Sequence, residues 1–133
     1  KRWCDKLGLL SHATFVIGLP GDTLEKAHTT FDFALKLNTS TAQWSIATPY
    51  PGTLFYNEVK ESGFLRDVPW SCFDGTRSCV LDYPVFSYDE IESCHRDLCT
   101  RWAVHKEGLI PYTFKKTAIR TLGLVSDVKE AVF

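Results

Sequence analysis

The sequence ATFVIGLPGDT, residues 13–23, holds the signal that decides the fold. Its first five residues are small, β-branched or aromatic and are followed by a Gly-Leu-Pro-Gly turn, which predicts a buried β-strand over residues 13–17. Asp22 and Glu25 then stand three residues apart, a spacing that predicts a capping box with Asp22 as the N-cap of a helix. Residues 38–40 are predicted to end this helix. Its apolar face is formed at helical spacing by Leu24, Ala27, Phe31, Ala34 and Leu35.

A second short strand is predicted over residues 43–47, QWSIA, in which Trp44 and Ile46 face one way and the residues between them the other. A strand, a helix and a strand in succession predict a parallel pair with a right-handed crossover. Residues 48–53, TPYPGT, close the second strand, because their two prolines lack the N–H that a strand ladder needs. Thr53 is then the predicted N-cap of a short helix.

The remaining sequence is predicted to be mostly helical, apart from one short strand over residues 78–82. Ser87 and Glu90 form a second capping-box pattern, so a long helix is expected to begin at Ser87 and to end at Gly108. Two further helices are predicted between Tyr112 and Phe133. One face of the long helix is predicted to contain Ile91, Cys94, His95, Leu98, Trp102 and His105.

These elements predict an α/β region over residues 1–66 and a mostly helical C-terminal extension over residues 67–133. The first nine residues, KRWCDKLGL, read as the last turns of a helix that ends at Gly8, where glycine favours the left-handed conformation. Domains seldom open on the end of a helix. We therefore expect the chain to be the C-terminal part of a longer polypeptide.

The composition excludes several classes of protein. The 133 residues are 44% hydrophobic and 23% charged, which suits a globular domain rather than a disordered chain. A net charge of −1 provides no broad basic surface, so no nucleic-acid partner is expected. The chain shows no signal peptide and no apolar stretch near the roughly 18 residues that span a bilayer, so a cytoplasmic location without a membrane span is expected. The five irregularly spaced cysteines predict reduced thiols that pack as small hydrophobic side chains.

The turn after the first strand is the first candidate binding site. Gly18 lets a ligand approach the backbone closely, and the helix that follows offers N–H groups at its positive end. The turn after the second strand lies at the same sheet edge, where Tyr50 can stack on a planar ligand. Neither turn matches a Walker motif or G-x-G-x-x-G. Taken alone, each is equally consistent with a rigid connection that binds nothing.

The two turns together resemble radical S-adenosylmethionine (SAM) enzymes, and most of all the branch that often carries an N-terminal cobalamin-binding domain. The resemblance rests on FVIGLPGDT, then a helix, then TPYPGTLFY, in the order and spacing of that branch over about residues 8–70. It implies that the two strands are the last of a partial (β/α)₆ TIM-like barrel. It also implies reductive cleavage of SAM at a [4Fe-4S] cluster to give a 5′-deoxyadenosyl radical, or cobalamin-dependent methyl transfer.

The resemblance assigns a SAM-contacting role to the two strand ends and assigns no catalytic residue or metal ligand in this chain. The family's C-x-x-x-C-x-x-C motif is absent, so the cluster ligands are expected upstream of Lys1, and cobalamin is a further candidate cofactor. The family's usual glutamate is Asp22 here, and we expect a structural role for it. The implied partners are a small-molecule substrate and the upstream remainder of the polypeptide. The implied cofactor-binding residues are Val16, Ile17, Gly18, Pro20, Gly21, Thr48, Pro49 and Tyr50.

Two other interpretations stay open. The chain is either a stand-alone α/β module that holds a nucleotide or phosphate at residues 18–23, or an interaction domain that docks a partner through residues 87–133. Under the radical SAM interpretation, this chain alone is expected to bind SAM weakly or not at all and to perform no chemistry. The aromatic residues Trp70, Phe73 and Tyr83 either face an apolar substrate or pin their loop to the core. His95 and His105 are expected to pack rather than to bind a metal.

Overall fold

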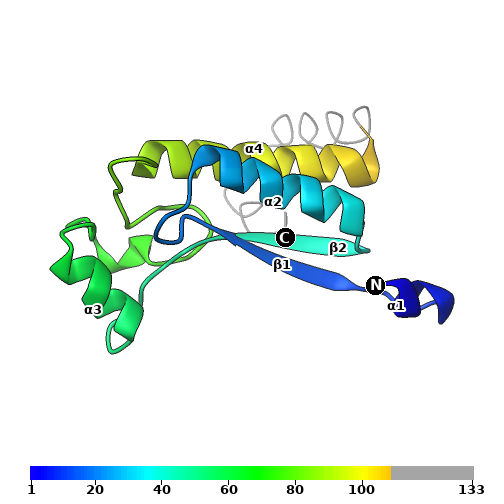
Figure 1. Ribbon diagram of the computed structural model, residues 1–133, viewed down its shortest axis with the longest axis horizontal. Coiled ribbons are helices and arrows are strands. Elements are labelled where there is room, and N and C mark those ends of the chain that lie inside the picture. Colours follow the sequence, from blue (N-terminus) through cyan, green and yellow to red (C-terminus); the bar gives the residue numbers. More distant parts are fainter. Residues whose placement is uncertain (109–133) are drawn as a thin grey trace, which may run out of the picture. The chain divides into compact units, whose positions relative to one another are not determined.

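The computed structural model describes residues 1–108. The chain divides into two compact units, Lys1–Leu98 and Cys99–Phe133, so residues 67–98 belong to the same unit as residues 1–66. The domain boundary near residue 66 stays a prediction, and the helices predicted after Tyr112 lie outside the described residues. Figure 1 shows the elements in chain order: α1 (Arg2–Lys6), β1 (His12–Ile17), α2 (Leu24–Leu37), β2 (Thr41–Ile46), α3 (Leu54–Glu61), the 3₁₀ helix η1 (Trp70–Cys72) and α4 (Tyr88–Glu107).

The two strands form a parallel pair, as the order of strand, helix and strand predicts. Phe15 lies opposite Trp44 and Ile17 opposite Ile46. β2 begins two residues earlier than predicted, because the N–H of Thr41 already donates to the carbonyl of Ser11 at 3.2 Å. The strand predicted over residues 78–82 does not form, and the described chain has there only one antiparallel bridge, between Leu65 and Leu81.

One face of the sheet is apolar and buried. Phe15 and Trp44 stack with ring centroids 4.7 Å apart, and Phe31 of α2 reaches the same tryptophan at 5.6 Å. Burial of each such side chain stabilises the fold by about 1.5–3 kcal/mol. α2 therefore covers this face, as the helical spacing of its apolar residues predicts (Figure 1). The buried residues of this core include Ile17, Ala27, Ala34, Ile46, Ile91 and Leu98.

The opposite face of the sheet is more polar. Its β1 side chains, His12, Thr14 and Val16, are exposed. Nδ1 of His12 lies 2.8 Å from Oγ1 of Thr41 on the neighbouring strand, which places both side chains on this face. The sheet thus separates an apolar core from a surface that presents hydrogen-bonding groups.

The two edges of the sheet differ. Ladder bonds such as Ala47 N–H to the Ile17 carbonyl use alternate residues, so the backbone groups of Trp44 and Ile46 point away from β1. That edge is covered, because Nε2 of His95 lies 2.9 Å from the Trp44 carbonyl and Ile46 N–H donates to the Gly75 carbonyl at 2.7 Å. No strand within residues 1–108 pairs with the other edge of β1.

The start of α2 corrects one prediction. Thr23, not Asp22, is the N-cap: its backbone is extended, and Oγ1 accepts from the N–H of Lys26 at 3.2 Å. Glu25 therefore does not complete a capping box with Asp22. The physical reason is that the Asp22 side chain turns back toward the end of β1, where two backbone N–H groups need a partner.

Other predicted helix ends are confirmed. Thr53 caps α3 by accepting from the N–H of Tyr56 at 3.2 Å. At the start of α4, Oε2 of Glu90 accepts from the N–H of Ser87 at 2.9 Å, which is the backward half of a capping box. Asn38 ends α2 in the left-handed conformation. None of the helices within residues 1–108 combines the length and apolar character needed to cross a bilayer.

Candidate functional site

The two predicted binding turns lie together at the C-terminal end of the two strands, which is called the carboxyl edge of the sheet. Because β1 and β2 are parallel and Ile17 is in register with Ile46, both strands end at the same place. The N–H of Ala47 donates to the carbonyl of Ile17 at 2.8 Å, so the two strands are still hydrogen-bonded where the turns begin. Ligands of parallel α/β proteins bind at this carboxyl edge.

The first turn is held by the carboxylate of Asp22. Oδ2 accepts hydrogen bonds from the N–H groups of Gly18 and Leu19, each at 3.0 Å. Nζ of Lys26 donates to the carbonyl of Gly21 at 2.7 Å and closes the turn from the helix side. The turn therefore has a carboxylate where an anion-binding loop would present unused N–H groups.

Gly18 has two reasons to be glycine. Its φ is +81°, in the left-handed region that L-residues rarely adopt. A Cβ at this position would also lie 3.3 Å from two side-chain carbons of Ile91, which is completely buried. The close approach of α4 and the backbone conformation thus both require a residue without a side chain.

The second turn holds Tyr50 at the rim, which is the surface formed by the two turns after β1 and β2. Pro49 is fully buried and fixes the chain, whereas the Tyr50 side chain is 53% exposed. The Tyr50 hydroxyl donates to the carbonyl of Phe73 at 3.3 Å, and Oγ1 of Thr53 donates to the carbonyl of Tyr50 at 2.7 Å. Thr48 turns its hydroxyl inward, to the carbonyl of Ile46 at 3.1 Å.

The predicted SAM-contacting residues thus differ in what they present. Val16 and Tyr50 expose side chains, with Val16 42% exposed, and Pro20 and Gly21 are exposed in the first turn. Ile17, Gly18 and Pro49 are buried and present little surface to a ligand. The structure brings the two groups to one edge. Their role in binding stays a prediction.

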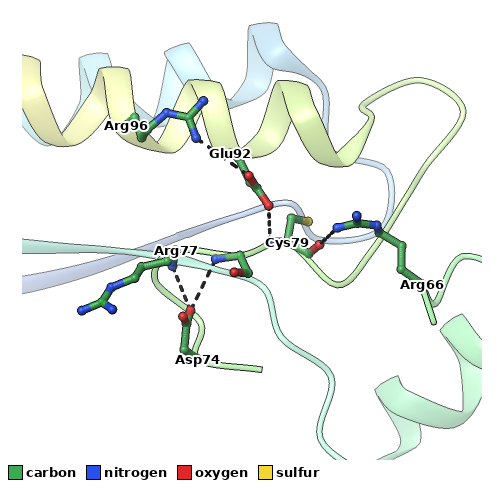
Figure 2. Close-up of polar contacts among 7 residues, drawn as sticks. Arg66, Asp74, Arg77, Cys79, Glu92 and Arg96 are labelled. Atoms are coloured by element: carbon green, nitrogen blue, oxygen red, sulfur yellow. Dashed lines mark hydrogen bonds and ion pairs between the residues drawn. The ribbon is translucent and has the colours of Figure 1, made fainter. Parts of the chain in front are cut away.

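Asp74, which belongs to none of the predicted motifs, orders the loop that covers the outer side of β2 through Gly75 (Figure 2). The carboxylate of Asp74 accepts from the N–H groups of Thr76 and Arg77, each at 2.8 Å. Partial burial opposes ionisation, but these bonds to the ionised form prevail and lower the pKa of Asp74. The Asp-Gly-Thr sequence at residues 74–76 is a typical turn signal and was the available hint.

The end of that loop is fixed from two sides (Figure 2). Oε1 of Glu92 on α4 accepts from the N–H of Cys79 at 2.9 Å, and Nη1 of Arg66 donates to the Cys79 carbonyl at 2.5 Å. The Arg66 guanidinium also stacks over the ring of Tyr88, 3.6 Å from its centroid. Arg96 lies 3.8 Å from Glu92 and is largely exposed. Sequence reasoning missed Arg66 and Glu92, because their partners are backbone groups far along the chain.

His95 and the cysteines have structural surroundings. His95 is buried, and burial lowers its pKa, although the bond to the Trp44 carbonyl acts in the opposite direction. This confirms the prediction that His95 packs. None of the five cysteines, all of which lie within residues 1–108, forms a disulfide. Burial raises the pKa of Cys79 and of Cys99 to about 11, which makes both poor nucleophiles at neutral pH.

The side chains of residues 1–108 do not fit a metal or iron–sulfur centre. Within residues 1–108, no three His, Cys, Asp or Glu side chains lie close enough together to hold a metal ion. A [4Fe-4S] cluster takes several cysteine thiolates at one place. Cys94 and Cys99, the closest cysteines in sequence, both lie on helix α4.

No family model matches the chain. An uncharacterized methyltransferase of Pyrococcus horikoshii is 32% identical over 123 residues, which cover 88% of this chain and 27% of that protein. A bacteriochlorophyllide d C-8(2)-methyltransferase of Chlorobaculum tepidum is 29% identical over 119 residues, which cover 90% of this chain and 24% of that protein. The chain spans about a quarter of the length of each relative. It is therefore similar to a part of two proteins that are named as methyltransferases.

Proposed function

We propose that this chain forms the C-terminal part of a SAM-dependent methyltransferase of the radical SAM family and contributes the two strand ends that flank SAM. Two relatives with methyltransferase in their names support methyl transfer as the reaction class. The motifs FVIGLPGDT and TPYPGTLFY support the finer assignment to the radical SAM family. The substrate, and the choice between radical cleavage and cobalamin-dependent methyl transfer, belong to the whole polypeptide.

The observation that carries the proposal is the position of the Asp22 carboxylate. A turn binds phosphate when it presents several unused backbone N–H groups. In the turn before α2, Asp22 occupies the N–H groups of Gly18 and Leu19 and adds a negative charge beside them. SAM carries no phosphate, and its sulfonium is positive. The turn therefore favours SAM over a nucleoside phosphate, which also argues against the phosphate-binding module.

Each exposed group at the sheet edge has a role in this proposal. The Tyr50 ring, oriented by its hydrogen bond to Phe73, offers a face on which adenine stacks. Val16, which is 42% exposed at the end of β1, supplies an apolar contact. SAM supplies a methyl group on a sulfonium when it is bound. The chain's own residues bind and orient it.

The sheet itself fits the proposal that β1 and β2 are the last two strands of a partial barrel. The outer edge of β2 is covered by His95 and Gly75, whereas no strand of residues 1–108 pairs with the outer edge of β1. A preceding parallel strand would complete that edge. The cluster and any cobalamin would be held by residues outside this chain, and no catalytic step is assigned here to either.

The proposal is tested in the complete polypeptide that it implies. Replacing Tyr50 with alanine is expected to raise the KM for SAM about tenfold, the scale of one lost base–aromatic stack, with a smaller effect on kcat. Tyr50→Phe should keep most of the affinity, because it keeps the ring. Phe33→Ala, at an exposed aromatic residue of α2, is the matched control. Equal effects at Tyr50 and Phe33 would refute the assigned site.

A further inference from the structure

A second concave site lies beside the rim. It is a groove of about 310 Å³ between α3 and the segment that follows it, at the lower end of the range for small-molecule sites. None of its residues belongs to the predicted SAM contacts. The groove is lined by Tyr56, Lys60, Leu65, Arg66, Asp67, Val68, Trp70 and Phe73.

The aromatic residues of the loop divide into two roles. Tyr83 is buried and meets Phe64 edge to face at 5.3 Å, so it pins the loop to the core. Trp70 lines the groove and is 65% exposed. Phe73 supports it, with ring centroids 4.7 Å apart and planes tilted by 40°. Trp70 therefore offers a ring face to a ligand instead of filling the core.

The charged residues of the groove favour an anion. Lys60 and Arg66 oppose one carboxylate, Asp67, which leaves a formal charge of +1 (two cations minus one anion). The Arg66 guanidinium is held in place by the Cys79 carbonyl and by the Tyr88 ring. Nζ of Lys60 lies 5.9 Å from the centroid of the Tyr56 ring, so both side chains lie on the same part of the wall.

The groove connects to the rim through one residue. Phe73 lines the groove, and its carbonyl accepts the hydrogen bond from the Tyr50 hydroxyl at 3.3 Å. A molecule in the groove would thus lie next to one bound at the strand ends. This proximity is what a methyl acceptor and a methyl donor require.

We propose that this groove binds the substrate through a flat, unsaturated ring system that stacks on Trp70 and a carboxylate that faces Lys60 and Arg66. That the bound molecule is a substrate rests on the proposed function. Binding to the groove does not depend on that function, because it is measured without any methyl donor. The two proposals can therefore fail separately.

The test uses the complete polypeptide without added SAM and two fluorescent probes that share one flat ring system. One probe, 1-pyrenebutyrate, is anionic, and the other, 1-pyrenebutanol, is neutral. Binding is followed by fluorescence anisotropy. Trp70→Ala is expected to weaken both probes about tenfold, the scale of one lost aromatic stack, while Trp70→Phe retains most of the affinity. Lys60→Gln is expected to weaken only the anionic probe, about threefold, and added salt should act in the same direction.

Matched controls lie elsewhere on the chain. Trp3 is 69% exposed on α1, and Lys36 is exposed in the last turn of α2. Trp3→Ala and Lys36→Gln should leave both affinities unchanged. The proposal is overturned if Trp3→Ala weakens the probes as much as Trp70→Ala does, if the two probes bind the parent chain equally, or if neither probe binds. Far-UV circular dichroism confirms that each variant keeps the parent's helices.

Discussion

The carboxylate of Asp22 accepts a hydrogen bond from the backbone N–H of Gly18 at 3.0 Å and binds the next N–H, of Leu19, at the same distance. The two N–H groups of this turn are therefore already used, and the charge beside them is negative. Under the proposed function, a ligand without phosphate and with a positive centre suits this end of the sheet better.

The same contact predicts an effect on stability. Asp22→Ala should lower the free energy of unfolding by about 1–3 kcal/mol, because two backbone N–H groups lose their partner. Glu25→Ala should change it by less than about 0.5 kcal/mol, since Glu25 is exposed and forms no capping box. Urea denaturation of both variants measures the difference. If Glu25→Ala lowered the free energy of unfolding more than Asp22→Ala, the predicted capping box would be supported and the Asp22 contact contradicted.

That contrast shows what local sequence patterns could and could not predict. The spacing of Asp22 and Glu25 matches a capping box, and the pattern correctly places a helix there. It does not say that Thr23 caps the helix while Asp22 turns back to the strand. A capping-box pattern considers only residues at the start of one helix. The Asp22 side chain instead accepts hydrogen bonds from N–H groups of the preceding turn.

Gly18 and Gly21 form a natural pair for a test of backbone and packing effects. Their φ angles are +81° and +80°, but a Cβ would meet Ile91 only at Gly18. Gly21→Ala should therefore cost about 1–2 kcal/mol from the left-handed backbone alone. Gly18→Ala should cost about 1 kcal/mol more, because Ile91 is buried and has little room to move.

The extra cost at Gly18 has its own control. Ile91→Val removes one carbon from the contact and should recover part of the loss in the Gly18→Ala background. Thermal or urea unfolding of the single and double variants gives the coupling energy. Equal costs at the two glycines, with no recovery, would show that α4 does not pack against the turn.

The pH dependence of stability should follow His95. Burial lowers its pKa in the folded chain, so protonation favours the unfolded state. The stabilising effect is fully present above the unfolded value of about 6.5 and is lost as the pH falls toward the lower folded value. His95→Gln, which keeps an N–H donor for the Trp44 carbonyl but does not titrate, should flatten this part of the profile.

The measurement is the free energy of unfolding between pH 8 and pH 5, a range of about one and a half pH units on either side of the ordinary histidine pKa. His12→Gln, on the exposed face of the sheet, is the control and should leave the slope unchanged. An unchanged slope in His95→Gln would contradict the account.

The loop behind the rim should depend on Glu92 far more than on Arg96. Glu92→Ala leaves the N–H of buried Cys79 without its partner and should cost about 1–3 kcal/mol. Arg96→Ala removes only an exposed ion pair at 3.8 Å and should cost at most about 0.5 kcal/mol. Hydrogen exchange at the amide of Ile46, which donates to Gly75, should accelerate only in Glu92→Ala. Similar acceleration in both variants would mean that the ion pair, not the bond to Cys79, holds the loop.

The sequence allowed prediction of the parts of the fold that depend on period and turn chemistry. The parallel pair, α2 and the cap at Thr53 are confirmed. Of the predicted apolar face of α2, Ala27, Phe31 and Ala34 are buried, whereas Leu24 is 45% exposed. The irregular segment was harder, because Arg66, Asp74 and Glu92 act on backbone groups whose positions only the tertiary fold sets. The groove that holds Trp70 arises in the same way and has no signature in the local sequence.

NMR tests most directly whether the carboxyl edge of β1 and β2 favours SAM over a nucleoside phosphate. The ¹⁵N-labelled chain is titrated to millimolar ligand with SAM and, separately, with adenosine monophosphate; the technique detects the weak binding expected of this chain alone. SAM should shift the amide resonances of Gly18, Thr48 and Tyr50, and adenosine monophosphate should shift them less. Asp22→Asn should narrow this difference between the two ligands. Stronger shifts with adenosine monophosphate, or none with SAM at these three amides, would contradict the preference for SAM.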